Sequence, residues 1–203
     1  MRKILTNLII LTIVFAFNLK ADDQSVLNIT DKDYFIGDPE APVTIIEYAS
    51  MSCSHCADFH NNTLEDLKSE YIDTGKVKFV FRDFPFNYPA LAGSMMMRCI
   101  PNDSRYDYMN ALYKLQKSWV FRDHGKTKAE LYKIMQSGGM KQIEFDACLA
   151  DVDLENALLE DVMSAQREFN IRSTPTFIVN GVLYSGNKNI KEFRQIIDKI
   201  LSQ

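Results

Sequence analysis

The sequence predicts an α/β fold in which a block of helices interrupts one small sheet. Two runs rich in β-branched and aromatic residues, at residues 43–50 and 76–84, flank a helical pattern. This order is typical of a right-handed parallel strand–helix–strand unit. Residues 89–169 then favour helix throughout, and the segment TFIVNGVLYSG that follows combines two short strand patterns with an Asn-Gly turn. We therefore expect the helices to lie between the two halves of the sheet.

Local signals place the first elements along the chain. The stretch DYFIGDPEAP mixes aromatic residues with Gly and Pro, which predicts a short edge strand and a turn. The run VTIIEYAS predicts a strand buried on both faces. Apolar residues at helical spacing then predict one long helix that stops near Gly75, and Pro85 prevents the next strand, KVKFVFRDF, from continuing as a central one.

The chain divides into four predicted segments. Residues 1–21 form a signal peptide, and residues 22–88 form the first part of the sheet with its long helix. Residues 89–169 form the helical insertion, and residues 170–203 form the hairpin and a last amphipathic helix, KEFRQIIDKIL. With 46% apolar and 25% charged residues, the 203-residue chain has enough apolar content for one core and too much charge for a polytopic membrane protein. Its net charge of −4 does not favour nucleic-acid binding.

The N-terminus has the pattern of a secretory signal peptide. Arg2 and Lys3 precede an apolar run over residues 4–17, and a small residue, Ala21, ends the segment. A retained membrane anchor is the alternative, although the run is shorter than the roughly 20 residues that span a bilayer. Removal of residues 1–21 leaves all four cysteines in the chain, and an even cysteine count fits export to an oxidising compartment.

The stretch MSCSHC places Cys53 and Cys56 at the start of the predicted long helix. Such a pair can bind a metal, form an inert disulfide or act as a reactive dithiol. A zinc site needs about four ligands, and the sequence has no second CxxC and only His55, His60 and His124 as histidine ligands. The N-terminus of a helix favours a thiolate, which is the nucleophile in disulfide exchange. We therefore expect a reactive dithiol and no metal.

Three separated elements together resemble the DsbA type of bacterial periplasmic thiol–disulfide oxidoreductases, which belong to the thioredoxin superfamily. They are EYASMSCSHC after a buried strand, the helical block between the two halves of the sheet, and RSTPTFIVNG near the C-terminus. The resemblance covers the chain from Val43 to its end. It implies a thioredoxin-like fold with a helical insertion, a location in the periplasm, and disulfide exchange with exported proteins without a cofactor.

The resemblance also implies roles for the residues of the CxxC motif. Cys53 would form the mixed disulfide with the substrate, and Cys56 would resolve it. His55 would stabilise the thiolate of Cys53 and thereby make the disulfide a stronger oxidant. Ser54 stands where this type usually has Pro, a departure that bears on the redox potential and not on the reaction type.

Glu47, Thr174 and Pro175 complete the candidate site. Glu47 matches the buried acid that the family places beneath the resolving cysteine, where it would carry protons to and from Cys56; an acid at the strand edge that reaches water is the alternative. The resemblance implies a cis bond at Pro175 and a free backbone at Thr174 for an extended substrate. A trans proline at the start of a strand has the higher base rate.

Cys99 and Cys148 both fall in the predicted helical insertion. Our hypothesis is a second, structural disulfide that staples two insertion helices and stabilises the fold by about 2 to 4 kcal/mol. Two unpaired buried thiols are the alternative, since spacing alone does not establish pairing. His60 shares a helix face with Cys56, and we interpret it as a packing residue and not as a catalyst.

The sequence thus predicts a monomeric oxidase that passes the Cys53–Cys56 disulfide to reduced or unfolded exported proteins. The resemblance implies reoxidation by a membrane quinone-linked thiol oxidase. One alternative is an isomerase or reductase with the same chemistry, which Thr174 favours because Thr occurs there in isomerases. Isomerases of the related type are usually dimers through an extra N-terminal domain, for which residues 22–42 are too short. A redox-independent binder of unfolded chains, using the groove beside Pro175, is the other alternative.

Overall fold

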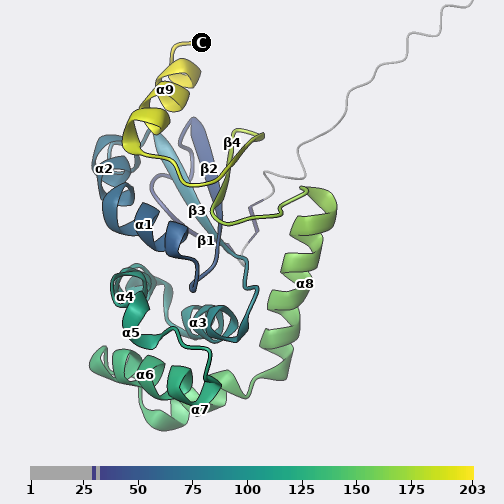
Figure 1. Cartoon of the computed structure of the whole chain (residues 1–203). Coiled ribbons are helices and arrows are strands. Elements are labelled where there is room, and N and C mark those ends of the chain that lie inside the picture. Colours follow the sequence, from purple (N-terminus) through teal and green to yellow (C-terminus); the bar gives the residue numbers. More distant parts are fainter. Residues whose placement is uncertain (1–28, 31–32) are drawn as a thin grey trace, which may run out of the picture.

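The computed structural model describes residues 29–30 and 33–203, and the signal peptide predicted at residues 1–21 lies outside them (Figure 1). A five-stranded sheet lies at one end of the molecule, and a group of helices lies at the other. Within the described residues, no helix combines the length and the apolar character needed to cross a membrane.

The sheet has the strand order β1-β3-β2-β4-β5. The parallel pair β2 and β3 forms its centre, and β1, β4 and β5 are each antiparallel to a neighbour. Because β2 has a strand on both sides and layers on both faces, Val43, Ile45 and Ile46 are fully buried, as the continuous apolar run predicted. The strands are β1 (Tyr34–Ile36), β2 (Val43–Ala49), β3 (Val77–Asp83), β4 (Thr176–Val179) and β5 (Val182–Ser185).

One face of the sheet carries the helices that begin with the CxxC motif and end the chain (Figure 1). Phe59 of the first helix lies at the centre of an aromatic cluster, with its ring centroid 4.8 Å from that of Phe177 and 5.7 Å from that of Phe193. Each such buried ring contributes about 1.5 to 3 kcal/mol. The elements are α1 (Ser54–Asn62), α2 (Leu64–Leu67), the π-helical turn η2 (Lys68–Ile72) and α9 (Ile190–Leu201).

The prediction of one long helix after the cysteines was wrong in detail. The helix breaks at Thr63, whose backbone has φ −123° and ψ −39°, and its last turn is π-helical. The apolar spacing nevertheless continues through the break, so Leu64 and Leu67 stay in the same core as Phe59. Periodicity therefore identified the buried face without locating the interruption.

Six helices lie between β3 and β4 in the chain, and together they form the helical insertion. Their core includes Trp119 and the three consecutive residues Met95, Met96 and Met97, which are 0 to 3% exposed. The same cluster reaches Cys56. The helices are α3 (Tyr88–Cys99), α4 (Asn102–Lys114), α5 (Gln116–Trp119), α6 (His124–Ser137), α7 (Gln142–Leu149) and α8 (Val152–Glu168).

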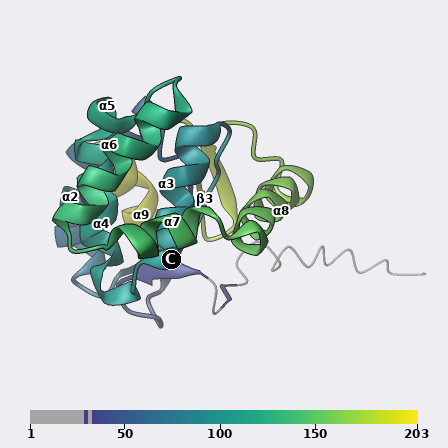
Figure 2. The ribbon, with the colours of Figure 1, turned by 90° about the horizontal axis from the view of Figure 1, so that it is seen from below.

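The last of these helices, α8, leads the chain back to the sheet and covers the face opposite to α1 and α9 (Figures 1 and 2). Ala165 of α8 packs there against Ile46 and Ile178 of the central strands. The sheet is therefore enclosed on both faces, and the chain observed between β3 and β4 is the helical block that the sequence predicted.

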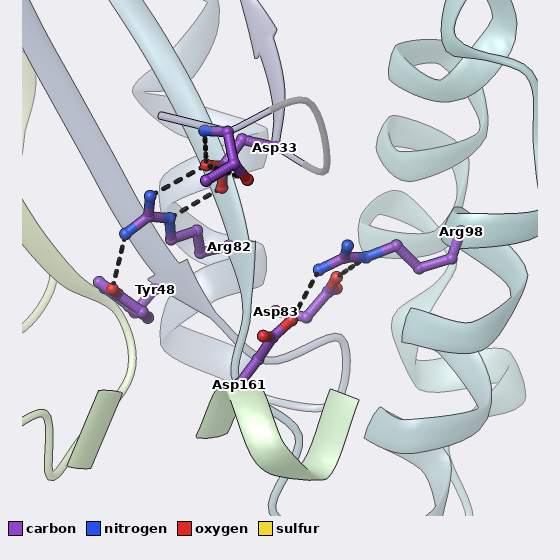
Figure 3. Close-up of polar contacts among 7 residues, drawn as sticks. Asp33, Tyr48, Arg82, Asp83, Arg98 and Asp161 are labelled. Atoms are coloured by element: carbon purple, nitrogen blue, oxygen red, sulfur yellow. Dashed lines mark hydrogen bonds and ion pairs between the residues drawn. The ribbon is translucent and has the colours of Figure 1, made fainter. Parts of the chain in front are cut away.

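Partly buried ion pairs surround the end of β3, and one of them joins the sheet to the insertion (Figure 3). Arg82 of β3 donates two hydrogen bonds to Asp33, at 2.8 and 3.0 Å. Arg98 of α3 donates to Asp83 at the end of β3 at 2.8 Å and lies 3.6 Å from Asp161 of α8. The Asp83 carboxylate raises the pKa of Arg98, so this guanidinium remains a fixed charge at the point where three elements meet.

Candidate active site

The end of β2 places the cysteine pair at the N-terminus of a helix. β2 ends at Ala49 and α1 begins at Ser54, so Cys53 is the N-cap residue, with φ −80° and ψ 123°. The N–H of Ala57 donates to the Cys53 carbonyl at 3.0 Å, which closes the first turn. Both cysteines are free thiols: Cys53 is partly buried, and Cys56, one turn inside, is fully buried.

The surroundings of Cys53 favour its thiolate. The contact with the Cys56 thiol is the largest cause that lowers its pKa, to about 5; burial opposes this, and the Thr174 side chain and the N–H groups of Cys56 and His55 add to the lowering. Backbone N–H groups at a helix start are the donors that the sequence predicted. His55 supplies its backbone N–H, and its side chain is exposed to solvent.

The pKa of Cys56 is shifted in the opposite direction to that of Cys53. Burial is the largest cause that raises its pKa, followed by the contact with Cys53 and by the negative charge of Glu47. At neutral pH the pair therefore holds one thiolate and one thiol, with the thiolate on the more accessible sulfur.

Glu47 is fully buried in the central strand, so it does not reach water at a strand edge. Its Oε2 atom lies 2.9 Å from Nε2 of His60, and both side chains are at most 1% exposed. His60 packs in the core as interpreted from the sequence, but its contact with Glu47 was missed. Two signals pointed to it: His60 follows Cys56 by one helical turn, and a buried carboxyl group needs a partner.

The segment before β4 lies against Cys53. The Thr174–Pro175 peptide bond is cis, and the Cys53 thiol donates to the Thr174 carbonyl at 3.3 Å. Antiparallel pairing of Tyr48 with Thr176 holds this segment beside the end of β2. The structure thus brings Thr174 and Pro175 to the cysteine pair, from the far end of the chain.

The helical insertion holds the loop before α1. The buried side chain of Gln116, on α5, donates to the Met51 carbonyl at 3.0 Å and to the Cys53 carbonyl at 2.9 Å. Asn87, the N-cap of α3, accepts a hydrogen bond from the Ser52 hydroxyl at 3.0 Å. Neither contact was predicted, because no local pattern connects residues so distant in sequence.

Cys99 and Cys148 are joined in a disulfide that links the ends of α3 and α7. The structure therefore contains the pairing of our hypothesis and not the two free thiols of the alternative. Cys99 is the last residue of α3, and Cys148 lies in the last turn of α7.

Two of the histidines considered as zinc ligands have other partners in the structure. The ring of His124, on α6, stacks on that of Tyr88 with centroids 4.1 Å apart, whereas His60 is paired with Glu47. Among residues 29–30 and 33–203, no group of three or more His, Cys, Asp or Glu side chains is arranged to hold a metal ion.

Relatives of known sequence point to disulfide chemistry. The family model described as Thioredoxin matches residues 29–199. A Rickettsia felis protein named for protein-disulfide oxidoreductase activity is 30% identical over 176 residues, which cover 86% of this chain and 62% of that protein. This chain therefore spans less than two thirds of that relative. A Bacillus cereus protein named for disulfide bond formation is 27% identical over 208 residues, which cover 97% of this chain and 92% of that protein.

Solved structures agree with the sequence relatives. The crystal structure of alpha-DsbA1 from Wolbachia pipientis has a TM-score of 0.83 and 30% identity, and the match covers 89% of this chain and 96% of that one. BdbD from Bacillus subtilis shares the fold, with a TM-score of 0.70 at 22% identity. The chain belongs to the thioredoxin family and, within it, to the DsbA-type proteins.

Proposed function

We propose that the protein is a thiol–disulfide oxidoreductase that introduces disulfide bonds into exported proteins. The observation that carries the proposal is the contrast within one CxxC motif, in which the pKa of Cys53 is lowered to about 5 and that of Cys56 is raised. A stable thiolate is a good leaving group, so the disulfide that contains it is readily donated. The names of the relatives support the same activity.

The proposed reaction begins with the Cys53–Cys56 disulfide. A substrate thiolate attacks Sγ of Cys53, the S–S bond breaks, and its electron pair leaves on Sγ of Cys56, which takes up a proton. A second substrate thiolate then attacks the substrate sulfur of the mixed disulfide, and Cys53 leaves as a thiolate. Two electrons pass from the substrate to the protein, and the substrate gains one disulfide.

The remaining site residues have supporting roles in this proposal. The Thr174 backbone beside cis-Pro175 pairs with an extended segment of the substrate and aligns its thiolate with Cys53. Glu47 exchanges a proton with Cys56 as this sulfur alternates between disulfide and thiol. His55, exposed at the start of α1, tunes the thiolate of Cys53 through its imidazole.

The proposed setting follows from the same chemistry. An oxidising thiol protein acts where disulfides persist, which is the periplasm for a bacterial protein of this type. Its substrates are reduced or unfolded exported proteins, and a membrane quinone-linked thiol oxidase restores its disulfide. We propose that it works as a monomer, since one chain holds the cysteine pair, Thr174 and Pro175 together.

The reduction potential of the Cys53–Cys56 pair tests the proposal. The protein is equilibrated in glutathione buffers, and free thiols are trapped with a mass tag. A potential near about −120 mV is expected for a strong oxidase, and one near about −270 mV would place the protein with thioredoxin-like reductants.

Isomerase activity is the second candidate, and Thr174 before Pro175 is the residue that favours it. Refolding of a client protein with scrambled disulfides separates the two activities. An oxidase accelerates disulfide formation in the reduced client far more than reshuffling in the scrambled one. A variant with both Cys53 and Cys56 replaced by Ser that still promoted folding would instead favour a redox-independent binder.

A further inference from the structure

His60 is a buried titratable residue with no part in the reaction described above. Its Nε2 atom lies 2.9 Å from Oε2 of Glu47, and no hydrogen-bond partner within the described residues reaches the other nitrogen, Nδ1, or the other carboxyl oxygen, Oε1. Buried polar atoms in native proteins are nearly always satisfied, so two unsatisfied atoms on one pair call for an explanation. These two atoms are the ends of one hydrogen-bonded path, which runs from Oε1 and Oε2 of Glu47 to Nε2 and Nδ1 of His60.

The Glu47 end of this path lies within electrostatic reach of the resolving cysteine, because the negative charge of Glu47 contributes to the raised pKa of Cys56. Cys56 lies one turn before His60 on the same helix, and Tyr113 of α4 covers the imidazole with its ring centroid 4.0 Å away. Burial, together with the charges of Cys56 and Glu47, raises the pKa of Tyr113, so it remains a neutral phenol beside the pair.

The His60 end lies at a small cavity. The cavity has a volume of about 30 Å³, which is large enough for a water molecule, and His60 is one of its lining residues. The lining also includes the charged and titratable residues Tyr34, Arg82, Asp83, Arg98 and Arg105.

A second pocket continues from this lining toward solvent. It has a volume of about 160 Å³ and shares Arg82, Asp83 and Arg98 with the cavity at His60. It also includes Asp161, whose side chain is 53% exposed. Figure 3 shows this charged cluster, in which the Arg82 guanidinium group pairs with Asp33 and that of Arg98 lies between Asp83 of β3 and Asp161 of α8. Polar groups thus continue from the buried pair to the surface.

We infer that His60 is a positioning residue that relays protons between Glu47 and this cavity, so that Cys56 exchanges its proton with solvent through the interior of the protein. The inference rests on the proposed function and adds to it a path for the proton and a role for His60. When the Cys56 thiolate forms, the Glu47 carboxylate accepts the Nε2 proton of His60, and a proton passes from Glu47 to the sulfur. Nδ1 of His60 takes a proton from the cavity. One proton moves in total from solvent to the sulfur.

The relay explains why a histidine occupies this position. Imidazole accepts a proton on one nitrogen while it gives one from the other, whereas a fixed cation would only neutralise the carboxylate. A carboxyl group left with an unpaired charge in this core would also be costly to bury. The pair therefore delivers a proton to Cys56 and regains it without leaving a buried charge behind.

A two-step reaction with the aromatic disulfide DTNB tests this inference. In the reduced protein, the Cys53 thiolate attacks DTNB and releases one thionitrobenzoate anion, which is followed by its absorbance in a stopped-flow instrument. Cys56 then loses its proton, attacks Sγ of Cys53 and releases the second anion. The first release reports on Cys53 alone, and the second reports on proton removal from Cys56.

The variant His60→Gln keeps a donor for Glu47 but cannot relay a proton. We expect the second release to slow by at least about tenfold at pH 7, in the range of general acid–base effects, while the first release is unchanged. Glu47→Gln is expected to slow the same step, and the double variant to be no slower than the slower single one, because both residues act in one path. His124→Gln, which removes an exposed histidine on α6, is the matched control and is expected to leave both releases unchanged.

Two results would overturn the relay. One is a second release in His60→Gln that matches the unmodified protein; the other is an equal slowing of both releases, which would indicate a structural role. Loss of the second release in the unmodified protein would instead contradict the proposed dithiol function, so the two failures are distinguishable. The structure of His60→Gln is verified by its circular dichroism before the kinetics are compared.

Discussion

The chain contains two cysteine pairs, and exposure does not distinguish them. In each pair one sulfur is nearer to solvent: Cys53 is partly buried and Cys99 is exposed, whereas their partners, Cys56 and Cys148, are buried. The two pairs differ instead in which end of a helix they occupy. Cys53 caps the N-terminus of α1, but Cys99 and Cys148 lie at the C-terminal ends of α3 and α7.

This difference in position sets the chemistry of each pair. The N-terminal end of a helix stabilises a negative charge, and its C-terminal end destabilises one. A thiolate is therefore a stable product at Cys53 and an unfavourable one at Cys99 or Cys148, so reduction is easier for the first pair than for the second. Beside the contact with Cys56, the position at a helix terminus thus favours a thiolate in the first pair and disfavours one in the second.

Activity gives the largest expected contrast between the pairs. Cys53→Ser is expected to reduce oxidation of a reduced client protein to the uncatalysed rate, because no sulfur remains to carry the mixed disulfide. The double variant Cys99→Ala/Cys148→Ala is expected to retain the rate of the unmodified protein at temperatures where it stays folded. The measurement is the rate of disulfide formation in the client, and substantial turnover by Cys53→Ser would contradict the proposed mechanism.

Stability gives the reverse contrast. The Cys99–Cys148 disulfide closes a loop with a sequence separation of 49, for which chain entropy predicts about 4 kcal/mol of stabilisation. The variant Cys99→Ala/Cys148→Ala is expected to lose about this much free energy of unfolding in urea. Cys53→Ala/Cys56→Ala is the matched control, since it removes a pair separated by only two residues, and the two variants are compared at pH 4, where the Cys53 thiolate no longer stabilises the fold. An equal loss in both variants would contradict the division into a structural and a reactive pair.

A pH titration examines the thiolate of the reactive pair alone. The pKa of Cys53 in the folded, reduced protein is about 5, against an ordinary value of 9.0, and a lowered pKa stabilises the folded state above it. This stabilisation is complete above pH 9 and is lost as the pH falls through about 5. The full shift would correspond to about 3 kcal/mol at pH 7, and because Cys53 is only partly buried, solvent screening lowers this to about 1 to 2 kcal/mol. Cys56 remains a thiol in both the folded and the unfolded state near pH 7, so it does not contribute.

Two measurements check this dependence. The thiolate absorbance near 240 nm is expected to titrate with a midpoint near pH 5. The free energy of unfolding of the reduced protein, minus that of Cys53→Ser, is expected to fall by about 1 to 2 kcal/mol between pH 7 and pH 4. A midpoint near the ordinary value of 9.0 would show that the Cys56 thiol, Thr174 and the helix N-terminus do not stabilise the thiolate.

The sequence predicted those features that depend on local pattern. The strands around Glu47 and in the C-terminal hairpin, and the helix start at Cys53, follow from apolar runs, turn residues and the CxxC spacing. The contact of Glu47 with His60 was missed, because it depends on which face of α1 meets the sheet. The hydrogen bonds from Gln116 were missed because α5 is distant in sequence, and polar residues on short helices have no periodic signal.

Replacement of Gln116 gives the smallest expected effect. It tests whether the insertion only stabilises the loop before α1 or also sets the reactivity of Cys53. The variant Gln116→Leu leaves the Met51 carbonyl without its donor, whereas the Cys53 carbonyl still accepts from Ala57, so a loss of about 1 to 2 kcal/mol in stability is expected. The thiolate titration of Cys53 is expected to stay in place, because its donors come from α1 and Thr174. Lys117→Ala, exposed beside it on α5, is the control. A titration that moved toward the ordinary value would mean that the insertion also sets the reactivity of the pair.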